Sequence, residues 1–321
     1  MGLVERGRFF RQLAVLTRTG MPIVNAVRLA GDSAGGGYRA LGQRWADGCA
    51  RGGNLADQMR DAGEAPLPVA LVRAGETTGR LPDLCARAAD HDEQLHALRS
   101  TAIGKLVYPV FLLHMALVVP VLPGVITAGR SPLWLIAGPL TLWAVVGALA
   151  LIGNVWHRSG VLARLALLPG PNLLALPFLT SNTCLVLGSA VAAGLKFRDG
   201  LELAAGACGN RVLGARLRSA AVDIERGILP DLTAAVRRVG LPEAVTSLIA
   251  SGEQSGTLDR SLDHAAVAAR ESFTLRAAWA TKAFTSGIYA LVVLFVAWQI
   301  ISMMSGYVGS IQDAAKDLDS N

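Results

Sequence analysis

Three long apolar runs constrain the fold of this chain more than any other feature. They cover residues 106–126, 133–153 and 284–304, and none contains Asp, Glu, Lys or Arg. A helix of about 20 apolar residues is long enough to cross the hydrocarbon core of a bilayer. Charged residues make up only 17% of the chain, against about 25% in soluble domains. We therefore predict an all-α, polytopic membrane protein with three transmembrane helices, rather than a soluble protein with three buried core helices.

The charges beside these runs predict the side of the membrane that each part occupies. Lys and Arg are enriched in cytoplasmic loops. We place the two helical domains in the cytoplasm. The basic residues near the spans are then Arg99, Lys105, Arg158, Arg164, Arg276 and Lys282 inside, and Arg130 and Lys316 outside. We expect a first cytoplasmic helical-bundle domain at 1–104, a transmembrane hairpin at 105–153, a second cytoplasmic helical-bundle domain at 154–283, a third span at 284–304 and an extracytoplasmic tail at 305–321.

The rest of the sequence argues against several classes of protein. The net charge of +6 is spread along the chain without a Lys- or Arg-rich run, so we expect no nucleic acid partner. No GxxxxGK[ST] or HExxH motif occurs, and we expect no catalytic residue, cofactor or metal. The cysteines form no CxxC pair and suit reduced thiols in a cytoplasm; they are Cys49, Cys85, Cys184 and Cys208. The N-terminus lacks the apolar stretch of a cleavable signal peptide.

The chain repeats itself at a spacing of about 174–177 residues. Gly20 in the first half corresponds to Gly194 in the second. The clearest match is between residues 74–81, AGETTGRL, and residues 251–258, SGEQSGTL. We predict a repeat unit that consists of a helical domain followed by a membrane helix.

The shared Gly-Glu-x-x-Gly-x-Leu element predicts a helix–turn–helix corner in each repeat. We expect a positive φ at the second glycine and an apolar contact from the leucine across the corner. The two glutamates leave three alternatives open: the carboxylate holds the turn, recognises a cationic partner, or binds a divalent ion. The candidate turn or partner-binding residues are Gly75, Glu76, Gly79, Leu81, Gly252, Glu253, Gly256 and Leu258.

Residues 82–99 and 259–276 read as long helices that lead into the first and third spans. If each helix is continuous with its span, motion of the cytoplasmic domains would be transmitted into the bilayer by a stiff rod. The first of these helices also carries a polar cluster of His91, Asp92, Glu93 and His96. We interpret this cluster as a solvated face, with a metal site as the alternative.

Several of these segments resemble a known family. Residues 9–23, FFRQLAVLTRTGMPI, resemble the opening of the type II secretion F domain, and both corner elements resemble the most recognisable motif of that family. Lys105 followed by Tyr108 and Pro109 is similar to the family's start of the first membrane helix, and Lys282 holds the matching place before the third span. The second repeat departs from the pattern because it opens with LTSNTC at 179–184 and lacks Tyr-Pro before span three.

The resemblance covers nearly the whole chain and implies an inner-membrane platform, or scaffold, of a type II secretion or type IV pilus machine. The cytoplasmic domains would be six-helix bundles. The implied partners are a hexameric cytoplasmic ATPase, other inner-membrane assembly proteins, pilin or pseudopilin, the lipid bilayer and further copies of the chain. The platform would couple the ATPase to pilin assembly from a multi-pass position in the bacterial cytoplasmic membrane. The alternative is a small polytopic transporter or channel subunit, although the predicted spans offer almost no polar lining.

Overall fold

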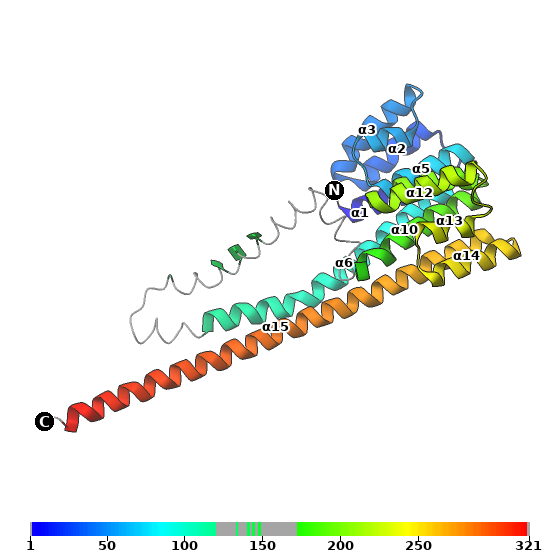
Figure 1. The fold of residues 1–321 in the computed structure, drawn as a ribbon. Helices are drawn as coiled ribbons and strands as arrows, with labels where there is room; N and C mark the ends of the chain where they lie inside the picture. The colour runs from blue at the N-terminus through cyan, green and yellow to red at the C-terminus, as the bar shows by residue number, and fades with distance from the viewer. Residues whose placement is uncertain are drawn as a thin grey trace. The chain divides into compact units, whose positions relative to one another are not determined.

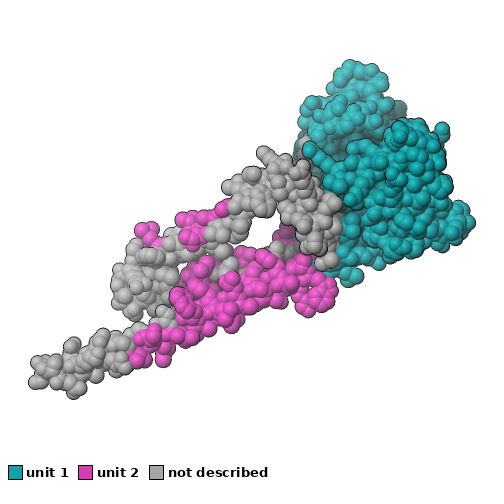
Figure 2. Space-filling model, in the orientation of Figure 1, with its two compact units in different colours: residues 1–99, 161–276 teal, residues 100–160, 277–321 magenta. Residues whose placement is uncertain are grey.

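The computed structural model describes residues 2–119 and 172–319, together with residues 133, 140, 141, 143, 144, 147 and 148. Every regular element among these residues is a helix. The chain divides into two compact units. Unit 1 comprises Met1–Arg99 and Val161–Arg276, and unit 2 comprises Ser100–Gly160 and Ala277–Asn321 (Figure 2). The all-α prediction is confirmed for the described residues.

The internal repeat predicted from the sequence is confirmed, because the same succession of six helices occurs twice in the described residues (Figure 1). The first repeat consists of α1 Leu3–Arg18, α2 Ile23–Ala34, α3 Gly36–Ala50, α4 Leu55–Asp61, α5 Pro66–Thr78 and α6 Leu81–Val118. The second consists of α10 Asn172–Ala192, α11 Phe197–Ala207, α12 Arg211–Glu225, α13 Leu232–Val239, α14 Glu243–Ser255 and α15 Leu258–Asp319. Each helix of one repeat therefore has a counterpart in the other.

The first helix of each repeat ends where the sequence predicts. Gly20 and Gly194 both have φ of 80°, a left-handed conformation that costs glycine little and a residue with a Cβ much more. Pro22 directly precedes α2, where its fixed φ suits a helix start. The two repeats thus share their first turn as well as their helix order.

The two repeats pack against each other within unit 1. Buried side chains from both repeats form one continuous apolar cluster, and α5 of the first repeat contacts α10 and α11 of the second. The largest buried side chains of the first repeat include Phe9, Tyr38 and Trp45, whose ring centroids lie 5.4 to 6.0 Å apart. Such contacts stabilise a core beyond the burial of apolar area alone.

Unit 2 contains the apolar parts of α6 and α15. Among the described residues, two helical stretches are long and apolar enough to cross a membrane, Leu81–Val118 and Leu258–Trp298, and only 7% and 6% of their apolar windows are buried. Large apolar side chains such as Phe111, Leu294 and Ile301 are exposed there. An exposed apolar surface of this kind suits lipid rather than water.

The predicted span at 133–153 and the end of the span at 106–126 lie outside the described residues, apart from the seven isolated positions. One of these, Trp143, donates a hydrogen bond from Nε1 to Nε2 of His114 at 3.0 Å. The third predicted span, 284–304, lies within α15, which continues as one helix to Asp319. The three-span topology stays a prediction.

Candidate functional site

The glutamate of the first corner binds the start of a neighbouring helix. Glu76 lies near the end of α5, and its carboxylate accepts hydrogen bonds from the backbone amides of Leu55 at 2.6 Å and Ala56 at 3.1 Å. These are the first two amides of α4, which have no partner within their own helix. Asn54, which precedes α4, makes no capping bond with its side chain. Glu76 therefore supplies the cap that Asn54 does not.

The second corner repeats this contact and adds to it. Glu253 accepts hydrogen bonds from the amides of Leu232 and Thr233, both at 2.9 Å, and from the hydroxyl of Thr233 at 2.6 Å. Here the residue before α13 also acts as a cap, since Asp231 accepts from the amide of Ala234 at 2.7 Å. The start of α13 is thus held by two carboxylates, whereas the start of α4 is held by one.

The glycines of each corner allow two helices to approach closely. Gly79 and Gly256 have φ of 72° and 70°, so the predicted left-handed conformation is confirmed. A Cβ on Gly75 would lie 2.8 Å from the Cα of Leu81, and real Cβ atoms do not approach other carbons so closely. A Cβ on Gly252 would collide with the side chain of Ser261. Leu81 packs against the buried core, and Leu258 is part of it.

The environment of Glu76 bears on the three alternatives for these glutamates. Burial raises the pKa of Glu76, while the bonds from Ala56 and Leu55 act in the opposite direction. Both carboxylate oxygens are occupied by backbone amides, which is the geometry that the structural alternative describes. No group of three or more His, Cys, Asp or Glu side chains among the described residues could hold a metal ion. Recognition of a partner by these residues stays a prediction.

A cluster of ionic and polar contacts joins the two repeats. Arg87 of α6 donates two hydrogen bonds to the carboxylate of Asp263 in α15, at 2.7 and 2.9 Å, and one to the hydroxyl of Ser189 in α10 at 3.3 Å. Arg80 donates to the carbonyl of Ala192. A paired, two-bond contact of this kind fixes geometry as well as charge. We refer to Arg87, Asp263, Ser189, Arg80 and Ala192 as the repeat junction.

The polar cluster of α6 differs from its prediction. His91 is 5% exposed and Asp92 is fully buried, so the interpretation as a solvated face is wrong for these two residues. Asp92 accepts two hydrogen bonds from Arg6 of α1, both at 2.7 Å. Arg6 also pairs with Glu64 at 3.4 Å. The cause is packing: α1 and α10 cover this side of α6, which the sequence of α6 alone cannot reveal.

The residues predicted at the start of the spans lie in unit 2. Tyr108 is exposed, and its ring centroid lies 6.1 Å from that of Tyr289. The α6 helix continues through Pro109 to Val118. Lys282 of α15 lies 5.7 Å from the ring centroid of Trp279, within the range of a cation–π contact. Lys105 is exposed on α6. A cation next to aromatic rings suits a membrane interface.

Comparison with known proteins identifies relatives over most of the chain. The family described as "Type II secretion system (T2SS), protein F" matches residues 9–127 and 183–306. A protein of Vibrio cholerae named "Type II secretion system protein F" is 28% identical over 324 residues, which is 89% of this chain and 78% of that protein. A protein of Thermus thermophilus named "Type IV pilus assembly protein PilC" is 27% identical over 256 residues, which is 72% of this chain and 62% of that protein. The two family matches coincide with the two structural repeats.

Proposed function

Because this chain belongs to the type II secretion system protein F family, we propose that it is an inner-membrane platform of a type II secretion or type IV pilus machine. The platform couples a cytoplasmic ATPase to the assembly of pilin or pseudopilin subunits. The observation that carries this proposal is the duplicated six-helix repeat whose last helix, α6 or α15, continues as a long apolar helix. The names of the two relatives support both kinds of machine.

The proposed mechanism is mechanical rather than catalytic. Both α6 and α15 run without interruption from residues of unit 1 into residues of unit 2. In an α-helix every interior backbone group is hydrogen-bonded, so a displacement of one end is carried along the axis. The repeat junction ties α6 to α15 through Arg87 and Asp263, so both helices respond together to a partner that moves unit 1.

The proposed topology keeps unit 1 in the cytoplasm and places spans at 106–126, 133–153 and 284–304. The excess of Lys and Arg at the cytoplasmic ends of these runs supports it. Labelling of single cysteines from outside intact cells tests it. A cysteine at Arg130 should react with an impermeant maleimide, whereas one at exposed Arg260 should react only after the membrane is permeabilised. Reaction at Arg260 in intact cells would overturn this orientation.

A charge exchange at the repeat junction tests the platform function. Deletion of the gene in its host should abolish pilus or pseudopilus assembly, and the wild-type chain should restore it. Arg87→Asp alone should fail to restore assembly, because two carboxylates then face each other across the junction. The exchanged pair Arg87→Asp with Asp263→Arg should recover it at least in part. Pilin in the sheared surface fraction is the readout, and the membrane level of each variant is the control.

The proposal fails if the deletion leaves pilus assembly and secretion unchanged. If the single and exchanged variants both restore assembly fully, the junction does not carry the coupling, although the platform itself would stand.

A further inference from the structure

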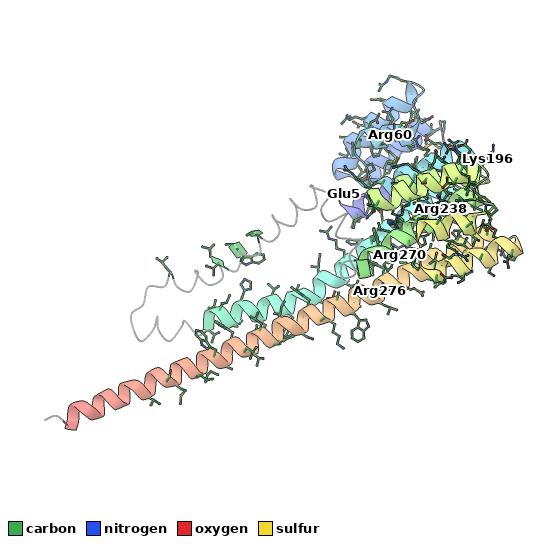
Figure 3. The ribbon with its side chains drawn as sticks, in the orientation of Figure 1. Glu5, Arg60, Lys196, Arg238, Arg270 and Arg276 are labelled. Atoms are coloured by element: carbon green, nitrogen blue, oxygen red, sulfur yellow. The ribbon has the colours of Figure 1, made fainter. Side chains whose placement is uncertain are left out.

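A pocket of about 270 Å³ opens where the two repeats meet. Its walls come from three helices of unit 1: α6 contributes His91 and Gln94, α10 contributes Ser181, and α15 contributes Asp263 and Arg270. Arg270 is among the side chains labelled in Figure 3. This volume corresponds to about nine water molecules, which is enough for a phosphate group and part of what it is attached to. The pocket is separate from the two corners that hold Glu76 and Glu253.

The carboxylates that line this pocket already have cationic partners. Asp263 pairs with Arg87 through two hydrogen bonds. Asp90 pairs with Arg11 of α1 at 2.6 Å. The hydroxyl of Ser181 donates to the carbonyl of Ala266 at 2.9 Å. These groups are therefore engaged within the protein, and the acidic ones are matched by arginines other than Arg270.

Arg270 differs from Arg87, the other arginine that lines the pocket. Its guanidinium makes one long hydrogen bond, from Nη2 to the carbonyl of His91 at 3.4 Å, and no ion pair with any described residue. Burial lowers the pKa of Arg270, and no carboxylate raises it. A guanidinium carries five N–H donors, and a partly buried cation without a counter-charge is costly. An anion in the pocket would remove that cost.

His91, on α6, adds a second unsatisfied group to the lining of the pocket. The ring is 5% exposed, and its Nδ1 is buried without a hydrogen-bond partner among the described residues. Buried polar atoms in proteins are nearly always hydrogen-bonded. Gln94 is exposed at the rim, and its amide has no bond to a described residue. A neutral imidazole can donate from Nδ1, and an amide NH₂ can donate as well.

We propose that this pocket binds a phosphate group, with Arg270 as the cationic anchor and His91 and Gln94 as further donors. A tetrahedral oxyanion has several acceptor oxygens, which suits donors that converge from two helices, and the planar guanidinium of arginine matches phosphate well. The bound group would join His91 of the first repeat to Arg270 of the second. It would therefore stabilise the contact between the repeats by mass action.

The test uses the full-length chain in a non-ionic detergent at constant ionic strength, with chloride exchanged for inorganic phosphate. At ten times its dissociation constant, phosphate should raise the unfolding temperature of the wild-type chain by about 3 °C. Arg270→Gln should weaken phosphate binding at least tenfold. Arg260→Gln is the matched control, because it removes the same charge from an exposed position on α15 outside the pocket, and it should respond like the wild type.

A second arm distinguishes the source of the phosphate. Short-chain phosphatidylglycerol is compared with short-chain phosphatidylcholine, whose head group carries no net charge. If phosphatidylglycerol alone raises the unfolding temperature, and Arg270→Gln loses this rise, the pocket binds a lipid head group. If inorganic phosphate raises the unfolding temperature, the pocket binds a free anion. Either supports the proposal. Arg270→Lys, which keeps the charge but loses the planar fork, should show an intermediate shift. The proposal is wrong if neither phosphate nor phosphatidylglycerol raises the unfolding temperature of the wild type. It is also wrong if these probes raise the unfolding temperature of Arg270→Gln as much as that of Arg260→Gln.

Discussion

In the first repeat the contact between α1 and α6 includes a buried ion pair, whereas the equivalent contact between α10 and α15 in the second repeat has no ion pair among the described residues and includes an aromatic pair, Phe178 with Phe273, whose ring centroids lie 5.4 Å apart. Arg6 pairs with buried Asp92 in the first repeat. Gly20 and Gly194 are 174 residues apart, and at this offset Arg6 corresponds to Thr180. Gly79 and Gly256 are 177 residues apart, and at this offset Asp92 corresponds to Ala269. Between α10 and α15 the described residues form a hydrogen bond from Ser181 to the carbonyl of Ala266.

The aromatic cluster differs in the same way. The positions of Phe9 and Phe10 are occupied by Thr183 and Cys184 in the second repeat, and both of these are fully buried. The corners, by contrast, keep the same glutamate-to-amide bonds. The same succession of six helices therefore forms around two different sets of buried side chains, and both repeats keep the corner. The second repeat also leaves Asp263 available to Arg87 of the first, which makes the junction possible.

The largest expected effect comes from breaking the buried ion pair of the first repeat. Arg6→Thr, which copies Thr180, leaves Asp92 buried without its cation and should lower the free energy of unfolding of unit 1 by about 3–5 kcal/mol. Adding Asp92→Ala, which copies Ala269, should recover at least half of that loss because no unpaired carboxylate remains. Urea unfolding of the full-length chain in detergent, followed by fluorescence in a background that keeps buried Trp45 as its single tryptophan, measures both.

The matched control for this pair is Arg11, whose ion pairs with Asp90 and Glu93 are about half exposed. Arg11→Leu copies Leu185 of the second repeat and should change the free energy of unfolding by less than about 1 kcal/mol. Equal losses for Arg6→Thr and Arg11→Leu would mean that the buried pair does not distinguish the repeats.

A smaller effect should separate the two corners. Glu76→Ala leaves the amides of Leu55 and Ala56 without partners and should cost about 2–3 kcal/mol, since bonds to charged groups are worth about 1.5–3 kcal/mol. Glu253→Ala should lower the free energy of unfolding by about 1–2 kcal/mol, because the first turn of α13 keeps one cap, the bond from the amide of Ala234 to Asp231. The same unfolding measurement compares them. A larger loss for Glu253→Ala than for Glu76→Ala would show that the second carboxylate is not a substitute cap.

The last expected difference is a dependence on pH that the first repeat has and the second lacks. Burial, followed by repulsion from Arg270 and Arg6, lowers the pKa of His91 to about 3. In the unfolded chain the pKa of His91 is about 6.5. Between about pH 3 and pH 6.5 the unfolded chain therefore binds one proton more than the folded chain. Stability should therefore fall as pH decreases below about 6.5, by up to about 1.4 kcal/mol per pH unit.

This pH dependence is checked by unfolding at pH 7, 6 and 5. His91→Gln should remove the contribution, and the substitution of exposed His96 by Gln is the matched control. Ala268 occupies the corresponding position in α15, so the second repeat offers no equivalent group. An unchanged slope in His91→Gln would contradict the assignment.

The sequence predicts the parts of this fold that depend on local chemistry. The glycine that ends α1, the corner at Gly79 and the matching positions of the second repeat follow from backbone preference and from the repeat itself. The burial of Asp92 could not be predicted, because it depends on which helix packs over α6. The pairing of Arg87 with Asp263, 176 residues away, likewise has no local signal, since it arises only when the repeats meet.

The close approach at Gly75 has a consequence for how a chain of this kind could be engineered. Its Cβ would lie 2.8 Å from the Cα of Leu81, so one added methyl group would act as a wedge between α5 and the start of α6. A Cβ on Gly252 would likewise separate α14 from the start of α15. An alanine at one position or the other would tilt one long helix while every charge on the molecule stays as it is.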